Sequence, residues 1–192
     1  MKLNAIKRCC MDKGQFLVFR SPEGRWLSNG SACWPTDGVV IRAEDVRAIF
    51  AISRKQMETI IIQEREVDDE RLALGAAPHE EELEMRGQVW DDGRLYAILQ
   101  GRSGVARLID TAWLKPVENS DEDMRFFLRP GSGGDWVAAF GGLLAEAIVA
   151  PESVERAEEI MGRVRELARM RVSEVQADAG EKPGVWAAAE KG

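Results

Sequence analysis

The chain has 192 residues and a mass of 21.4 kDa, with 45% hydrophobic and 31% charged residues and a formal net charge of −7. This composition is typical of a globular protein long enough to bury a core. No apolar run approaches the ~20 residues that a membrane-spanning helix needs, and the first residues lack the pattern of a signal peptide. Three cysteines, two of them adjacent (Cys9 and Cys10), exclude a disulfide framework. We therefore expect a reduced, cytoplasmic protein.

The charge is unevenly distributed along the chain. Residues 1–62 carry 10 basic and 6 acidic side chains, residues 63–92 carry 3 and 11, and residues 93–192 carry 13 and 16. Blocks of like charge resist collapse, so the middle stretch is expected to be a solvated linker or, alternatively, a surface for a basic partner. An acidic chain is not attracted as a body to nucleic acid or to an anionic membrane.

The N-terminal residues predict a short helix followed by a three-stranded meander. Leu3, Ile6 and Cys10 follow helical spacing up to Gly14, a residue that commonly ends helices. Residues 15–35 then alternate strand-forming segments with a Ser-Pro-Glu-Gly turn and an Asn-Gly turn.

A second helix and a fourth strand are predicted before the acidic stretch. Residues 43–51 suit a short helix with Val46, Ile49 and Phe50 as its buried stripe. Residues 59–62 are apolar and β-branched, which predicts a largely buried strand.

The second half of the chain is predicted to be built from hairpins. A short helix is expected around residues 79–85, and one helical turn at 111–116. Residues 143–149 are interpreted as the last strand rather than as the start of a helix. The other strands are expected at residues 88–90, 94–99, 105–109, 124–128 and 136–140.

Residues 151–176 give the clearest helix pattern, with apolar residues at three- and four-residue spacing. Pro151 suits the first helical position. Val164 and Leu167 belong to the apolar stripe, so we expect them to be buried against the sheet.

These elements predict an α+β fold with antiparallel, hairpin-built sheets, short helices and one long C-terminal helix. Its two halves, residues 1–65 and 87–176, are joined by the acidic segment 66–86. We expect one domain over residues 1–176 and a flexible tail over 177–192.

The sequence lacks the common catalytic and cofactor motifs. His79 is the only histidine and lies among glutamates, so it is expected to be exposed and cannot form a two-histidine metal site. No G-x-S-x-G motif is present, and residues 131–134 lack the Lys-Ser/Thr of a phosphate-binding loop. We predict no catalytic residue, no cofactor and no metal ligand. Asp91-Asp92 and residues 121–123 leave metal-assisted hydrolysis as an alternative.

The predicted partner-binding residues are the carboxylates of the acidic stretch. Residues 68–70 are expected to be well anchored beside a strand, and residues 80–84 to be mobile. The candidates are Glu64, Glu66, Asp68, Asp69, Glu70, Glu80, Glu81, Glu82 and Glu84.

Tryptophans supply a second set of candidates. Trp186, in the tail, is interpreted as a docked aromatic or, alternatively, as part of a partner-binding motif. The remaining five are expected in the core: Trp26, Trp34, Trp90, Trp113 and Trp136.

Two stretches resemble uncharacterised proteins encoded by prophages of clostridia-like bacteria. Residues 26–35, Trp-Leu-Ser-Asn-Gly-Ser-Ala-Cys-Trp-Pro, are similar to the pattern W-[IL]-G-[ND]-G-x-[AC]-x-[YW]-P, with Ser28 in place of the expected glycine. Residues 108–116 also resemble that group. With the order of elements, the resemblance covers residues 1–175, and it implies no known activity.

An architectural resemblance concerns the end of the second half. The succession of residues 124–128, 136–140 and 143–149 before Ala150-Pro151 is similar to the closing strands of bacterial DNA sliding clamps. A clamp needs a basic inner channel, and only residues 1–62 carry net positive charge.

The sequence thus supports three hypotheses. The first is a non-catalytic, phage-type binding protein that acts on a protein partner in nucleic-acid transactions, as a replication accessory with a clamp-like form as one version. The second is an anti-CRISPR-like inhibitor that uses its acidic surface, and the third is a metal-dependent nuclease. The expected partner is a protein with a basic surface, with no membrane and no direct nucleic-acid contact; a homodimer stays an open alternative.

Overall fold

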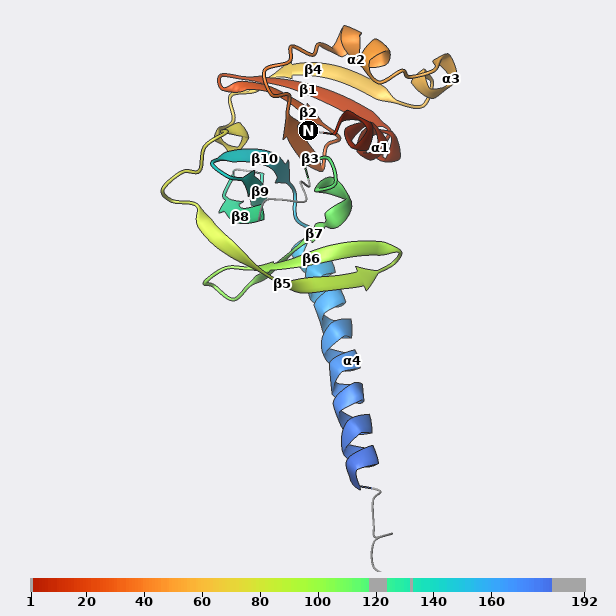
Figure 1. Cartoon of the computed structure of the whole chain (residues 1–192), viewed down its shortest axis with the longest axis vertical. Helices are drawn as coiled ribbons and strands as arrows, with labels where there is room; N and C mark the ends of the chain where they lie inside the picture. The colour runs from red at the N-terminus through yellow and green to blue at the C-terminus, as the bar shows by residue number, and fades with distance from the viewer. Residues whose placement is uncertain (1, 118–123, 132, 181–192) are drawn as a thin grey trace, which may run out of the picture. The chain divides into compact units, whose positions relative to one another are not determined.

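The computed structural model describes residues 2–117, 124–131 and 133–180, with side chains up to Arg171. The chain divides after Glu152 into two compact units. The first unit holds a ten-stranded sheet and short helices, and the second holds the C-terminal helix (Figure 1). The predicted α+β class is therefore confirmed. None of the described helices is long and apolar enough to cross a membrane.

The first elements follow the predicted order, with one additional short helix, α3, that was not predicted. Gly14 ends the first helix with φ 66°, a conformation that glycine adopts without strain. Asn29 closes the second turn: its Oδ1 accepts from the N–H groups of Ser31 and Ala32, and its Nδ2 donates to the carbonyl of Cys9. The elements are α1 (Leu3–Lys13), β1 (Gln15–Ser21), β2 (Gly24–Ser28), β3 (Ala32–Pro35), α2 (Ala43–Ile49), α3 (Arg54–Met57) and β4 (Ile61–Glu66).

The second half is built from hairpins, as predicted. Asp92 and Gly93 both have positive φ, which suits the tight turn of its first hairpin. The elements are η1 (Glu70–Leu72), β5 (Glu81–Asp91), β6 (Arg94–Gln100), β7 (Ala106–Asp110), η2 (Thr111–Trp113), β8 (Met124–Arg129), β9 (Trp136–Gly141) and β10 (Leu144–Val149).

One continuous sheet joins the two halves, with strand order β4-β1-β2-β3-β10-β9-β8-β5-β6-β7. The junctions are the β3–β10 and β8–β5 pairs, and all neighbours are antiparallel except β1 and β4. β5 pairs with two strands in succession: its residues Glu81–Leu83 pair with β8, and the rest of its length pairs with β6. A bulge between Met85 and Gly87 lies near the start of the β5–β6 pairing.

Three predictions about elements are wrong. β4 is not largely buried: Ile61 is 55% exposed, because β4 is an edge strand with β1 as its only neighbour. Ile49 is 40% exposed, so the buried stripe of α2 is narrower than expected. Residues 81–85 form a strand and not a helix, because Leu83 and its neighbours pair with the apolar strand β8.

Each face of the sheet carries its own core. On one face, α1 and α2 cover residues that include Phe16, Leu27 and Trp34. On the other face, the cover comes from residues 67–80, which we call the strap. Its Leu72 belongs to a cluster with Trp26 and with side chains of β8 to β10. The central part of the acidic stretch is therefore structural.

The second unit contains α4 (Val154–Gly180). The Ser153 hydroxyl accepts from the N–H of Arg156, a typical N-cap contact, so the helix begins after Pro151 and not at it. Leu167 is 66% exposed and Val164 is half-buried, so the burial predicted for Leu167 is wrong. The helix continues through Gly180, and Trp186 lies outside the described residues.

Candidate functional site

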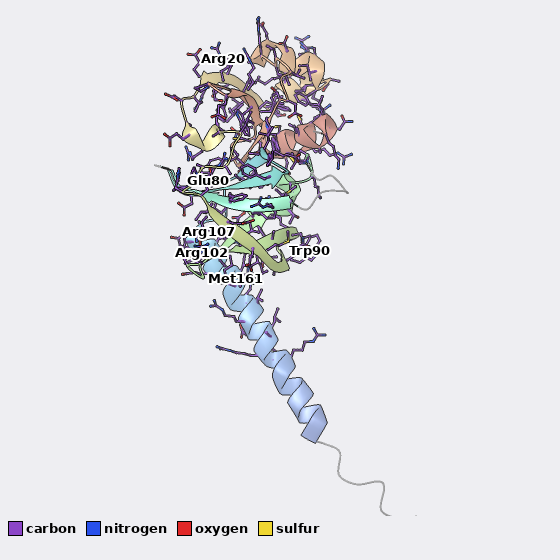
Figure 2. The ribbon with its side chains drawn as sticks, turned by 60° about the vertical axis from the view of Figure 1, so that its left-hand side comes forward. Arg20, Glu80, Trp90, Arg102, Arg107 and Met161 are labelled. Carbon is purple, nitrogen blue, oxygen red and sulfur yellow. The ribbon has the colours of Figure 1, made fainter. Side chains whose placement is uncertain are left out.

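The first two predicted acidic residues tie β4 to its neighbours. Glu64 accepts from the backbone N–H of Ala43 at the start of α2 and pairs with Arg25 and Arg20, each at 3.2 Å. The Ala43 N–H and the two arginines hold the pKa of Glu64 below its usual value. Glu66 pairs with Arg20 at 2.8 Å, and its side chain is 76% exposed. Arg20 is labelled in Figure 2.

Asp69 anchors the start of the strap. Its carboxylate accepts from the backbone N–H of Arg71 and from the guanidinium of the same residue, with the shortest contact at 2.5 Å. These bonds, led by that of the Arg71 side chain, lower the pKa of Asp69. The Arg71 guanidinium also lies 5.3 Å from the centre of the Trp136 ring. Asp68 and Glu70 are exposed.

The Glu80 side chain is buried and ion-paired, so this residue is anchored, unlike the mobile position predicted for the 80–84 group. Glu80 pairs with Arg129 at 2.8 Å, and the two side chains are only 4% and 2% exposed (Figure 2 labels Glu80). Arg129 also donates to the carbonyls of Arg71, Ala73 and Gly75. Burial lowers the pKa of Arg129, and the attraction of Glu80 opposes that effect. One buried guanidinium thus holds the middle of the strap and its C-terminal end.

The remaining candidates lie on β5. Glu81 accepts from the backbone N–H of Arg102, Glu82 pairs with Arg125 at 2.9 Å, and Glu84 pairs with Arg86 at 2.6 Å. Arginines of the same unit therefore offset much of the charge of the acidic stretch. The repulsion between these carboxylates is therefore balanced within the fold, and it does not by itself indicate an external basic partner.

The three cysteines are buried and free. Burial raises the pKa of Cys9 to about 11 and that of Cys33 to about 12, and it raises the pKa of Cys10 still further. All three are therefore neutral thiols at physiological pH, which makes them poor nucleophiles.

Metal-ligating residues do not gather within the described part of the chain. Among these residues no group of three or more His, Cys, Asp or Glu side chains is arranged to hold a metal ion. His79 is exposed, as predicted, and Asp91-Asp92 lie in and beside the β5–β6 turn. Residues 121–123 lie outside the described residues.

The five tryptophans predicted in the core differ in how far they are exposed to solvent. Trp26, Trp34 and Trp113 are buried as predicted, and the indole N–H of Trp34 donates to the carbonyl of Trp113 at 3.0 Å. Trp136 is half-buried. Trp90 is 70% exposed, so its predicted core position is wrong; it lies near the tip of the β5–β6 hairpin, where few neighbours can cover it.

An open hollow of about 750 Å³ lies where β3 and β10 diverge. We call it the apolar hollow. Two turns present its rim: Asp37 and Gly38, with φ 49° and 79°, form a type I′ turn, and Gly142 has φ 68° in the β9–β10 turn. The rim side chains and their exposed fractions are Val39 (57%), Val40 (61%), Leu143 (88%) and Leu144 (55%).

The wall of the apolar hollow contains one polar group without a partner. Trp26 is fully buried and lines the hollow, and no hydrogen-bond acceptor meets its indole Nε1. A buried donor left unpaired costs about 1–3 kcal/mol. Glu23, Asp37 and Glu146 also line the hollow.

Sequence reasoning missed this site. In the sequence, the site is indicated only by two turn dipeptides next to apolar residues, Asp37-Gly38 and Gly141-Gly142. The fold brings these two turns to the same hollow, which the sequence does not show. Comparison of the chain with protein-family models, with curated proteins and with solved structures gave no match.

Proposed function

We propose that this chain is a non-catalytic binding protein that holds an apolar and basic segment of a protein partner in the apolar hollow. The observation that carries the proposal is the rim of four exposed aliphatic side chains around one hollow. Apolar side chains exposed together on one surface are typical of binding sites.

The charge of the rim indicates the chemistry of the partner. Three carboxylates, Glu23, Asp37 and Glu146, and one guanidinium, that of Arg25, line the hollow. Arg25 is bound by Glu64 and by the carbonyl of Ile41, so the lining is acidic on balance. An acidic rim favours lysine or arginine beside the apolar anchor. The basic partner expected from the sequence is retained, but its contact is moved to the hollow.

The resemblance to prophage-encoded proteins supports placing this partner in nucleic-acid transactions of a mobile element, as in a replication accessory.

Selection from a displayed library of random peptides tests the proposal. We expect the enriched peptides to combine an apolar residue with lysine or arginine, and Leu143→Asp to abolish their binding. Leu167→Asp is the matched control, because Leu167 is also an exposed leucine but belongs to the second unit. Peptides that bind wild type and Leu143→Asp equally would contradict the proposal.

A second candidate is the anti-CRISPR-like inhibitor that uses its acidic surface. The observation that favours it is the exposure of Asp68 and Glu70 on the strap, next to the 76% exposed Glu66. Charge reversal at Asp68 and Glu70 should then weaken binding of lysine-rich peptides and remove its salt dependence. If this reversal has no effect while Leu143→Asp does, the apolar hollow carries the binding.

A further inference from the structure

A second hollow, of about 660 Å³, lies between α1, the β5–β6 hairpin and η2. Its volume falls within the range of about 300–1,000 Å³ that is usual for small-molecule sites. We call it the cationic hollow, because three cations line it, Arg8 of α1, Arg94 of β6 and Lys115 after η2, against two carboxylates, Asp12 and Asp110.

The guanidinium of Arg94 is held in place. Its Nη1 donates to Asp110 Oδ2 at 3.0 Å, and the other oxygen of Asp110 accepts from the N–H of Ala112 at 2.9 Å. Asp110 is nearly buried, whereas the Arg94 side chain is 44% exposed. A guanidinium has five N–H donors, so Arg94 can bind an anion while it keeps its bond to Asp110.

Trp90 supplies an aromatic surface on the same hollow. Its side chain is 70% exposed, and Figure 2 shows it at the opposite end of the β5–β6 hairpin from Arg102. A planar ring can stack on an exposed indole, a contact that is worth about 1–3 kcal/mol per nucleic-acid base. Asp12, from α1, also lines the hollow and offers a carboxylate to hydroxyl groups.

We propose that the cationic hollow binds a nucleoside phosphate, with the base stacked on Trp90, the phosphates against Arg8, Arg94 and Lys115, and a sugar hydroxyl bonded to Asp12. The hollow combines an exposed aromatic ring, three cations and two carboxylates. Asp110 is paired with Arg94, so Asp12 is the carboxylate assigned to the sugar. The net charge of the protein disfavours long polyanions, so a mononucleotide, rather than a long strand, suits the site. This site is independent of the apolar hollow.

Calorimetric titration with ATP, adenosine and inorganic phosphate tests the assignment. We expect ATP to bind, and adenosine and phosphate each to bind at least about tenfold more weakly, since each keeps only part of the contacts. Trp90→Ala should weaken ATP binding by about fivefold to a hundredfold. Arg8→Glu combined with Lys115→Glu should weaken ATP binding but leave adenosine binding unchanged.

Matched controls lie on the same strand outside the hollow. Met85→Ala removes a half-exposed apolar side chain from β5, and Arg86→Glu reverses an exposed charge there; neither should change ATP binding. A short single-stranded oligonucleotide with a 5′ phosphate shows whether the natural ligand is a free nucleotide or the end of a strand. If the oligonucleotide binds more tightly than ATP, the ligand is a strand end; if it binds more weakly, the ligand is a free nucleotide. Failure of ATP and the oligonucleotide to bind at millimolar concentration would overturn the proposal. Equal affinity for phosphate and ATP, or no effect of Trp90→Ala, would also overturn it.

Discussion

On one face of the sheet, α1 and α2 bury Ile6 and Val46 over the strands; on the other, the strap covers the core with Leu72 and is held by arginine contacts. The helices cover their face through apolar packing, whereas the strap depends on a buried guanidinium bonded to three carbonyls and to Glu80. Three arginines on the strap face also lie over aromatic rings, namely Arg71 on Trp136, Arg125 on Phe127 and Arg129 on Phe140.

This difference teaches how an acidic segment can be part of a core. The carboxylates of the strap are balanced by cations of the same fold: Arg71 pairs with Asp69, and Arg129 pairs with Glu80. A polar cover of this kind depends on its charged partners more than an apolar one does, since a buried charge that loses its partner is strongly destabilising.

We therefore expect Arg129→Ala to lower the stability of the protein more than any other substitution considered below. This substitution leaves Glu80 buried without its cation and removes the donor to three strap carbonyls, so we expect a loss of about 3–5 kcal/mol of unfolding free energy in urea titration. The double variant Arg129→Met/Glu80→Met removes both charges and should cost less than the single one. A double variant that is less stable than Arg129→Ala would show that the ion pair itself is not what holds the strap.

The second prediction compares the apolar contacts of the two faces. Leu72→Ala should cost about 2 kcal/mol, at the low end of the range for buried leucine, because the strap can partly collapse onto the space. Ile6→Ala, on the helix-covered face, should cost more. Hydrogen exchange should become faster in residues 67–80 of Leu72→Ala while α1 stays protected. Equal acceleration in α1 would mean that the two faces do not open separately.

The parts of the fold that local sequence predicts are the hairpins and helices. Asn29-Gly30 and Asp92-Gly93 are turn signals that act over a few residues, and the structure has turns at both. The parallel β1–β4 pair and the β3–β10 junction join segments that are distant in the sequence, and no local pattern predicts which strands meet.

The surroundings of the predicted acidic residues could not be predicted from the sequence either, because they also depend on contacts between distant segments. A run of carboxylates is visible in the sequence, but its cations are not: Arg129 is 49 residues from Glu80, and Arg125 is 43 residues from Glu82. The exposure of Trp90 and the approach of residues 39 and 143 likewise depend on tertiary structure.

A smaller effect is expected from the Asp69–Arg71 pair at the start of the strap. The pKa of Asp69 is lowered in the folded state, so its contribution to stability is fully present above the unfolded pKa of ~3.9 and is lost as the pH falls through the folded value. Asp69→Asn should cost about 1 kcal/mol at pH 7. The difference from wild type should shrink as the pH is lowered below about 4. A difference that is independent of pH would assign the effect to the η1 cap rather than to the charge.

The smallest effect should come from Leu167→Ala, the same substitution as in the strap but at an exposed position of α4. Leu167 is 66% exposed, so truncation removes little buried area, and alanine is at least as good a helix former as leucine. We expect the unfolding free energy to change by less than about 0.5 kcal/mol. The contrast with Leu72→Ala then measures what burial in the strap contributes, because the two substitutions remove the same atoms. A loss of more than about 2 kcal/mol at Leu167 would mean that its side chain is buried in solution, by a second copy of the chain or by another surface. In that case the stability of the wild type should rise with protein concentration if the cover is a second copy, and stay constant if it is not.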